Sequence, residues 1–452
     1  MACSNRNIPP DRAVPRPPEA CSPLRRRLAG AAAAALLAGT LPAAQALAQN
    51  YVAIENTEIQ NVTARDPAGH WTPNTFINAD PLPLPQPAMD KDQFLDQARE
   101  VTESTIERGQ FAPAVSISAT PGGAQVDGQD VPEAAEVPPE PDDRLFPRSA
   151  LPMIAADVAA QEQTEDVTTP MVQPEEDEGA EPAENVVPDV FQPLDVGTAG
   201  AYFSSSRLVP TDARLEYPYR ANGKLFFEKP GGGSFICSGA VIKPRLVLTA
   251  GHCVHQGSGG GSAFYRRFLF VPAYHEGQAP YQAWNWTWVT TTASWASGGG
   301  GVPTQADFAI IEVEDRKFGT EIKKIGEVVG SLGYRTSALM PNHTKKVGYP
   351  GNHDSGQIMH QVDSQHHLAA AQSTVLFGSD MGGGSSGGAW IENFGVQAAG
   401  QTGGLQPLPN RVVGVTSYGY VSTDPKVQGS SILNQEFLTI LNAACQHRAG
   451  NC

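Results

Sequence analysis

Cysteine is scarce in this sequence, with six residues in a chain of 452. No two of them form a Cys-x-x-Cys pair, and no histidine stands at ligand spacing from a cysteine pair, so we expect no metal site. Cys3 and Cys21 would be removed with the leader described next. The later cysteines, an even number in a chain with an export signal, predict two disulfide bonds. They are Cys237, Cys253, Cys445 and Cys452.

Long apolar runs are also scarce. One apolar stretch, from Leu28 to about Leu41, follows the basic cluster Arg25–Arg27 and precedes a small-residue cleavage site, Ala46-Leu47-Ala48. A membrane-spanning helix needs roughly 20 apolar residues, and this stretch is shorter. We therefore expect residues 1–48 to be a removed signal peptide rather than an anchor. The protein would be secreted or periplasmic, with no stable membrane anchor.

Basic runs are short. The pairs Lys323-Lys324 and Lys345-Lys346 do not predict nucleic-acid binding, so we expect no nucleic acid among the partners. Glycine (46) and proline (38) are abundant instead, which excludes a helical bundle and favours β structure joined by loops. His360, His366 and His367 are expected in a solvated polar loop rather than in a metal site.

Negative charge is concentrated in one part of the chain. Residues 49–206 contain 29 acidic and 6 basic residues, whereas residues 207–452 contain 16 acidic and 19 basic residues. The acidity therefore says little about what the C-terminal part binds. Within residues 120–195 the abundance of Pro, Glu, Ala and Asp predicts disorder, because such sequence buries too little apolar surface to offset chain entropy. Residues 90–108 can form one amphipathic helix.

From Arg207 onwards, short apolar runs alternate with glycine-rich turns, a pattern typical of a β-barrel or β-sandwich. Leu433, Phe437, Ile440 and Leu441 recur with helical period and predict a C-terminal helix. The candidate strands are 235–242, 246–249, 268–274, 284–290, 308–313, 345–349, 373–377, 389–392 and 411–418.

Three short motifs follow one another in the order His, Asp, Ser. In the first, a candidate strand leads to His252 in a turn, where the ring can face a cleft. In the second, Asp307 heads a candidate strand, where its carboxylate can be shielded from water. In the third, glycines flank Ser386 and permit a tight turn. That turn can aim the backbone N–H groups of Gly384 and Ser386 at one point, as an oxyanion hole does.

These residue types together predict nucleophilic acyl transfer. A serine hydroxyl is a weak nucleophile near neutral pH and needs a base to take its proton. His252 would take the proton of Ser386 and later protonate the leaving group, while Asp307 would fix the imidazole tautomer. Each motif alone is common, and their joint occurrence in this order carries the prediction. The chemistry needs no metal ion and no organic cofactor.

The sequence from about Arg207 to Cys452 resembles the trypsin/chymotrypsin family of serine peptidases, and within it the bacterial branch that includes the glutamyl endopeptidases. Residues 237–242 followed by 249–253 resemble the segments around the family's histidine and its disulfide. Gly348-Tyr349-Pro350-Gly351 resembles a motif of the bacterial branch. Ser417-Tyr418-Gly419 resembles the family's Ser-Trp-Gly strand, which pairs with the substrate backbone.

The resemblance implies an all-β fold: two six-stranded antiparallel β-barrels with the active site between them and a C-terminal helix, preceded by a largely disordered acidic region. It implies that the nucleophile of the Gly-x-Ser-Gly-Gly pattern is Ser386, not Ser385. It also implies that Cys237 pairs with Cys253. Cys445 would then pair with Cys452 after the helix, and the alternative is that a cysteine is free.

Two departures from the family pattern concern activation and specificity. Animal trypsins have an aspartate immediately before the nucleophile, where it pairs with the new N-terminal amine, and this chain has Ser385 there. Asp380 stands six residues before Ser386, where a carboxylate selects Arg or Lys in trypsin, although bacterial relatives often carry it without that preference. Thr416 stands where glutamyl endopeptidases have histidine, which argues against a preference for Glu. The remaining expected substrate-binding residues are Ser417, Tyr418 and Gly419.

The sequence thus predicts a secreted serine endopeptidase, made as a precursor, that hydrolyses a protein or peptide substrate and acts as a monomer. Residues 49–206 would be a pro-segment that binds the enzyme, or else an acidic spacer, with chain release near Ser204–Val209. Residues 207–452 would be the protease domain. The alternatives are a catalytically silent homologue that acts as a binding or adhesion module, and an esterase with the same triad.

Overall fold

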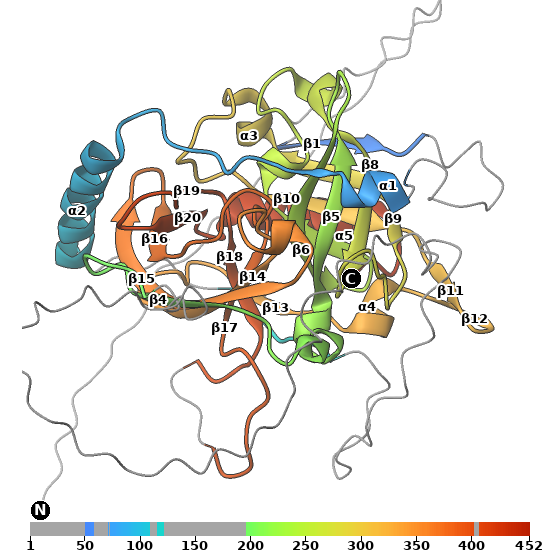
Figure 1. Cartoon of the computed structure of the whole chain (residues 1–452). Helices are drawn as coiled ribbons and strands as arrows, with labels where there is room; N and C mark the ends of the chain where they lie inside the picture. The colour runs from blue at the N-terminus through green and yellow to red at the C-terminus, as the bar shows by residue number, and fades with distance from the viewer. Residues whose placement is uncertain (1–49, 58–70, 72, 109–114, 122–195, 402–405) are drawn as a thin grey trace, which may run out of the picture. The chain divides into compact units, whose positions relative to one another are not determined.

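The computed structural model describes residues 50–57, 71, 73–108, 115–121, 196–401 and 406–452. These residues are mostly β structure, gathered into two large sheets and one small hairpin (Figure 1). The expected signal peptide and almost all of the stretch expected to be disordered lie outside the described residues. Among the described helices, none has the length and apolarity needed to cross a membrane.

The first sheet closes into a barrel of six antiparallel strands. The strand order is β9-β10-β7-β6-β5-β8, and pairing between β8 and β9 closes the ring. Trp284, Trp286 and Trp288 alternate along β9 and are all buried, as expected for residues that share one strand face. The six strands are β5 (Asn222–Glu228), β6 (Ser234–Lys243), β7 (Leu246–Thr249), β8 (Arg266–Pro272), β9 (Trp284–Thr292) and β10 (Ala309–Val313).

Six strands of the second sheet follow the order β20-β16-β15-β14-β17-β18. The two end strands also meet, because the backbone N–H of Val415 donates to Ser430 Oγ at 2.9 Å. The predicted all-β fold with two barrels is therefore confirmed. The six strands are β14 (His343–Gly348), β15 (His360–Ala370), β16 (Thr374–Gly378), β17 (Ala389–Glu392), β18 (Arg411–Val415) and β20 (Val427–Ser431).

The prediction of a polar loop around His360, His366 and His367 is wrong. All three residues lie in β15, whose backbone pairs with β14, β16 and β4. His360 is buried, and its Nε2 contacts Asp354 Oδ2 at 2.7 Å. Partner strands on both sides satisfy the backbone, so polar side chains do not prevent this strand from forming.

Shorter elements flank the barrels. The strands are β1 (Tyr51–Glu55), β2 (Asp80–Pro81), β3 (Ser116–Ile117), β4 (Phe203–Arg207), β11 (Arg316–Phe318), β12 (Glu321–Lys323), β13 (Gly333–Arg335) and β19 (Tyr418–Tyr420). The α-helices are α1 (Pro73–Ile77), α2 (Lys91–Arg108), α3 (Ala293–Ser297), α4 (Ile325–Val329) and α5 (Gln435–His447). The 3₁₀ turns are Thr211–Leu215, Tyr219–Ala221, Gly251–Cys253, Gly260–Ala263 and Asp354–Gly356.

The predicted C-terminal helix is α5. Asn434 caps it, because its side-chain oxygen accepts hydrogen bonds from the backbone N–H groups of Glu436 and Phe437. Phe437 is fully buried, and its ring lies 6.0 Å from that of Phe308, which precedes β10. The last helix of the chain therefore packs on the first barrel.

Several parts of the acidic N-terminal region are built onto the barrels. β1 extends the first sheet by pairing with β9, β2 pairs with β6, and β3 pairs with β13. The helix predicted over residues 90–108 is confirmed as α2, which lies beside the second sheet (Figure 1). The N-terminal region therefore contributes structure as well as charge.

The structure pairs Cys237 with Cys253 and Cys445 with Cys452. The first bond joins β6 to the 3₁₀ turn after β7, across a sequence separation of 16 residues. In the chain-entropy model, a crosslink that closes a loop of that size lowers the entropy of the unfolded chain and so stabilises the folded protein by about 3 kcal/mol.

We expect replacement of Cys237 and Cys253 by serine to lower the melting temperature by about 10 °C, since about 3 kcal/mol is lost from a domain of this size. Thermal unfolding followed by circular dichroism measures the change. The matched control replaces Cys445 and Cys452, whose loop is shorter and whose loss should cost somewhat less. An unchanged melting temperature in the first variant would contradict the structural role given to this bond.

Candidate active site

His252 and Asp307 meet because the strands that carry them are neighbours. β7 ends at Thr249 and leads to His252, whereas Asp307 precedes β10, and the ladder pairs Ala309 with Thr249. His252 Nδ1 lies 2.8 Å from Asp307 Oδ2, and the backbone N–H of His252 donates to Asp307 Oδ1 at 2.8 Å. The two residues are therefore joined through both carboxylate oxygens.

The carboxylate of Asp307 is completely buried and has a third partner. The Ser417 hydroxyl, which belongs to the second barrel, donates to Asp307 Oδ2 at 2.5 Å. Gly251 lies tightly against the same group, since a Cβ there would stand 3.0 Å from Asp307 Oδ1 and from the Trp295 ring. These contacts fix the carboxylate, which in turn fixes the orientation of the His252 ring.

The opposite nitrogen of His252 is left available. Its Nε2 is buried and has no hydrogen-bond partner among the described residues. Ser386 Oγ is likewise buried, and no described residue hydrogen-bonds to it. A base nitrogen and a hydroxyl without partners are the two atoms that proton transfer from a serine requires.

The turn that carries Ser386 is tied to the strand beside His252. The backbone N–H of Ser238 donates to the Ser386 carbonyl at 2.7 Å. Ser238 follows Cys237, and the disulfide partner of Cys237 is Cys253, which follows His252. Short covalent and hydrogen-bonded links therefore connect the serine turn to the histidine turn.

Only glycine fits at Gly387, the residue after the serine. Its φ is +76°, and a Cβ there would stand 2.0 Å from Thr249 Oγ1. The Gly387 N–H donates to the Thr416 carbonyl at 2.8 Å. The turn can therefore lie flat against the end of β7, the strand that leads to His252.

The neighbouring serine already has partners. Ser385 Oγ donates to the Gly382 carbonyl at 2.7 Å and accepts from Gln428 Nε2 at 3.0 Å. Its hydroxyl closes the turn, whereas that of Ser386 has no such structural partner. This difference favours Ser386 as the nucleophile.

The expected oxyanion donor Gly384 is also part of a tight turn. Its φ is +90°, and a Cβ there would stand 2.6 Å from the Tyr349 carbonyl oxygen. Its N–H donates at 3.0 Å to the carbonyl of Leu82, a residue of the N-terminal region. The Gly384 N–H therefore already has a carbonyl oxygen of the same chain as its partner.

The expected substrate-binding residues lie at the end of β18 and in β19. The Gly419 N–H donates to the Pro85 carbonyl at 3.0 Å, so this position is paired with backbone of the N-terminal region. Tyr418 is fully buried, and its hydroxyl contacts Thr374 Oγ1 at 2.8 Å. Thr416 Oγ1 accepts from the Trp390 ring N–H at 2.9 Å.

Asp380 forms an ion pair rather than standing alone. Its Oδ2 lies 3.1 Å from His353 Nε2, and its side chain is 9% exposed. The hydrogen bond with Asp380 raises the pKa of His353. Burial by itself would raise the pKa of Asp380, but hydrogen bonds from His353 and Ser205 hold it below its usual range. The negative charge at this position is therefore partly offset.

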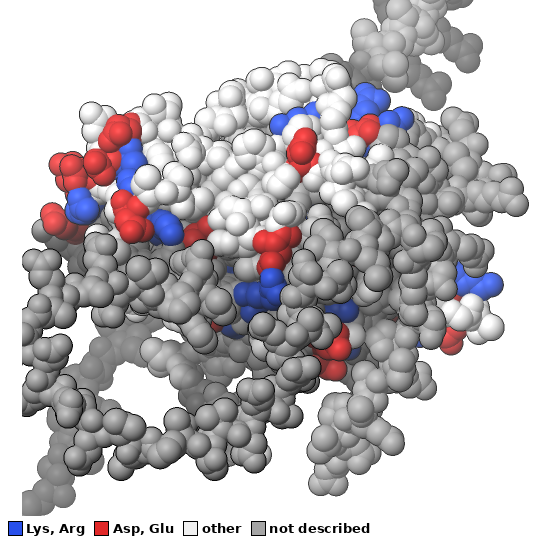
Figure 2. Space-filling view, in the orientation of Figure 1, with Lys and Arg blue, Asp and Glu red and all other residues white. Residues whose placement is uncertain are grey.

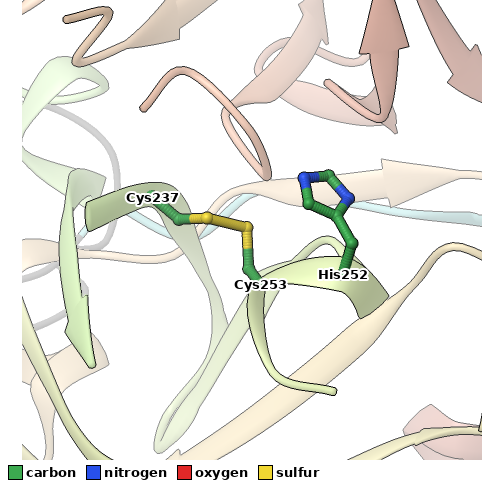
Figure 3. A group of neighbouring side chains, drawn as sticks. All are labelled: Cys237, His252 and Cys253. Carbon is green, nitrogen blue, oxygen red and sulfur yellow. A yellow bond between two sulfur atoms is a disulfide. The ribbon is translucent and has the colours of Figure 1, made fainter. Parts of the chain in front are cut away.

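Cys237, His252 and Cys253 lie close enough together to suggest a metal site, with ligand atoms within 4.8 Å of one another. Figure 3 shows that the two sulfurs are bonded to each other and that the His252 ring lies beside them. A disulfide has no thiolate to offer a metal ion. The disulfide therefore ties the turn that carries His252 to β6.

A family model described as Trypsin matches residues 213–440, half of the chain. The chain belongs to the trypsin family. The glutamyl endopeptidase of Bacillus licheniformis is 30% identical over 166 residues, which cover 35% of this chain and 46% of that protein. A Bacillus subtilis protein named extracellular metalloprotease is 27% identical over 150 residues, or 32% of this chain and 42% of that protein.

The chain thus spans less than half the length of either of these curated relatives. Among solved structures, the protease Anisep of Arthrobacter nicotinovorans is 28% identical, with a TM-score of 0.42. That match covers 51% of this chain and 98% of the other.

Two features of this trypsin-family member are not predicted from its sequence. Ser417 is expected to bind substrate, and its hydroxyl in addition contacts Asp307. Leu82 and Pro85 contact the glycines of the site, although the N-terminal region is expected to be mostly disordered. Proline alternates with other residues from Pro81 to Pro87, a pattern that is visible in the sequence and favours polyproline II backbone.

Proposed function

We propose that this protein is a serine endopeptidase that hydrolyses peptide bonds through an acyl-enzyme formed on Ser386. The main support is the His252–Asp307 pair, in which Asp307 contacts Nδ1 and leaves Nε2 without a partner among the described residues. The Ser386 hydroxyl also has no partner among the described residues. Membership of the trypsin family supports this reading. The order His, Asp, Ser disfavours an esterase of the α/β-hydrolase type, in which the order is Ser, Asp, His.

The reaction follows from these roles. Ser386 Oγ bonds to the carbonyl carbon of the substrate while its proton passes to His252 Nε2. The N–H groups of Gly384 and Ser386 stabilise the negative oxygen, and the intermediate collapses with transfer of the histidine proton to the leaving amine. Water then attacks the ester while His252 takes its proton, and the second intermediate collapses as the C–Oγ bond breaks and His252 returns that proton to Ser386 Oγ, which releases the acid product.

We further propose that the protein is exported and made as a precursor. Residues 1–48 would be the signal peptide, and residues 49–206 the pro-segment. Release near Ser204–Val209 would require that part of β4 leaves its ladder, because Ser204–Arg207 pair with β15. Val209, just beyond the strand, is 77% exposed. The substrate would be a protein or peptide, and the enzyme would act as a monomer.

The test of the endopeptidase proposal is covalent labelling by a fluorophosphonate, read by intact-mass spectrometry and followed by a peptide-hydrolysis assay. We expect one adduct per chain, on Ser386, and none in Ser386→Ala. Ser385→Ala is the matched control and should still be labelled. A chain that folds but never labels, even after limited proteolysis, would instead be the silent homologue. Turnover of esters but not of peptides would favour the esterase.

Asp380 and His353 give a prediction about specificity. Protonated His353 offsets the charge of Asp380, and deprotonation above its raised pKa uncovers that charge. We therefore expect the ratio of kcat/KM for Arg over Leu substrates to rise with pH. In His353→Gln the ratio should be about tenfold higher at pH 6, equivalent to one pKa unit of interaction, and should no longer vary with pH.

Peptide substrates that differ only in the residue before the cleaved bond measure this ratio. Gln357→Ala is a control, since Gln357 belongs to the same region but does not contact Asp380. A ratio that is flat with pH in the unmodified chain would show that Asp380 does not face the substrate.

A further inference from the structure

A stretch of the N-terminal region lies along the residues expected to bind substrate. β2 runs parallel to β6, with Pro81 opposite Ile236, and the Leu82 N–H donates to the Ile236 carbonyl at 3.1 Å. The Leu82 carbonyl accepts from Gly384, and that of Pro85 accepts from Gly419, each at 3.0 Å. Backbone thus pairs with backbone on both sides of the site.

Glycines let this stretch approach closely. A Cβ at Gly383 would stand 2.5 Å from the Leu82 carbonyl oxygen, and one at Gly351 would stand 2.2 Å from Pro81 Cγ. Real Cβ atoms essentially never come closer than 3.0 Å to a neighbouring atom, so a larger residue at either position would displace the stretch. The glycines therefore leave room for a peptide backbone, and the backbone that lies there belongs to the same chain.

Helix α2 fastens the stretch to the second barrel. Phe94 lies buried with its ring 6.0 Å from Tyr418 and 5.8 Å from Tyr420. Thr102 Oγ1 accepts from the Ala369 N–H at 2.8 Å and contacts the Ala369 carbonyl at 3.2 Å. Figure 1 shows the chain crossing from α1, beside the first sheet, to α2, beside the second.

The outer side of α2 is charged. Asp92, Asp96, Arg99, Glu100 and Glu103 are exposed, whereas Phe94, Leu95 and Ala98 are buried. In Figure 2 the mixed acidic and basic side chains gather over α2, and the adjoining face is mostly uncharged. The helix therefore has one face for the barrel and one for water, as a docked helix should.

The active-site atoms are covered in this arrangement. Ser386 is 0% exposed and His252 is 6% exposed. A nucleophile that no solvent reaches cannot receive a protein substrate. Leu82, itself 4% exposed, contacts the oxyanion donor Gly384 and lies on this covering stretch.

We propose that residues 80–108 are a built-in inhibitor of the cleft, in which residues 80–89 occupy the substrate groove and α2 holds them there. This inference rests on the endopeptidase function proposed above. Animal trypsins are activated when the aspartate before the nucleophile pairs with the new N-terminal amine, and Ser385 cannot form that ion pair. In the proposed mechanism the precursor is inactive because residues 80–89 occupy the substrate site.

The composition of the stretch explains why it can stay there. Between Asp80 and Ala88 every peptide bond has proline on one side. The carbonyl on Gly384 belongs to the Leu82–Pro83 bond, whose nitrogen carries a ring carbon in place of a hydrogen. Proline also fixes φ, so little backbone freedom is lost when the stretch is ordered. The result is a firmly bound and poorly cleavable occupant.

The test is the rate at which a fluorophosphonate labels Ser386 in the full-length chain. We expect slow labelling of the unmodified chain, and labelling about tenfold or more faster in Phe94→Ala, because loss of the buried ring frees α2 and raises the open population. Thr102→Val is a milder second variant that removes the hydroxyl's contacts with Ala369 and with the Ala98 carbonyl of the same helix, and it should also label faster. Gln97→Ala, on the exposed side of α2, should label like the unmodified chain.

A synthetic peptide of residues 80–108, added to Phe94→Ala, should slow its labelling again, whereas a scrambled peptide should not. Equal rates in the unmodified chain, Phe94→Ala and Thr102→Val would overturn the inhibitor while leaving the peptidase intact. Failure of all folded variants to label, even after limited proteolysis, would instead reject the peptidase and the inhibitor with it.

Discussion

In the processed enzyme, with residues 80–108 removed, alanine in place of Ser386 is expected to lower kcat for peptide hydrolysis about 10⁶-fold, without unfolding the chain. In the proposed mechanism the Ser386 hydroxyl forms the covalent bond to the substrate, and the other hydroxyl in the turn, that of Ser385, is held by Gly382 and Gln428. It therefore cannot substitute for the lost group. A quenched fluorescent peptide at saturating concentration measures kcat, and KM should change little, because the backbone donors at Gly384 and Gly419 remain.

The matched control is Ser385→Ala, which should keep activity within about tenfold and lose about 1 kcal/mol of stability with its hydrogen bonds. His252→Ala should lose as much activity as Ser386→Ala, and the double variant should lose no more, because the residues act as one unit. Additive losses in the double variant, or a silent Ser385→Ala enzyme, would mean that the nucleophile is assigned wrongly.

Asparagine in place of Asp307 is expected to lower kcat about 10⁴-fold at neutral pH. The carboxylate accepts from His252 Nδ1, from the His252 backbone N–H and from Ser417 Oγ. An amide fits the same space but brings its own N–H group, which must oppose one of these donors. The ring then takes the wrong tautomer, and Nε2 can no longer accept the serine proton.

Ser417→Ala is the graded control for Asp307→Asn. It removes one of the three donors and leaves the charge, so we expect a loss of about tenfold to 10²-fold, in keeping with one hydrogen bond to a charged group. The crystal or solution structure of Asp307→Asn should keep both turns in place. A loss of less than tenfold in Asp307→Asn would show that this carboxylate does not orient the histidine.

The site is foreseeable from the sequence because its residues occur in short motifs next to strands. Recognition of β7 and of the strand after Asp307 needs only their apolar runs. That the two strands are neighbours is a long-range fact, and it comes from the family resemblance and not from either segment. The same resemblance separates Ser386 from Ser385, where local sequence offers two equivalent hydroxyls.

Other elements escape sequence analysis for physical reasons. The run 411–418 suggests one strand, but β18 ends at Val415 and β19 begins at Tyr418. The break arises because the backbone of Thr416 bonds to Gly387 and Gly388 of the serine turn. β15 and β20 are rich in polar or small residues, and only their partner strands make them strands. Likewise, the prolines around Leu82 resemble a linker until a glycine-lined groove is beside them.

The hydrogen bond from Ser417 to Asp307 joins parts of the chain that are 110 positions apart. During translation, His252 and Asp307 are synthesised before Ser386, and Ser417 is synthesised after it. An incomplete polypeptide, however well its first half has folded, therefore carries a histidine with no serine to activate. Hydrolytic activity would thus appear only after Ser417 has been synthesised, and by then residues 80–108, the proposed inhibitor, have already been made.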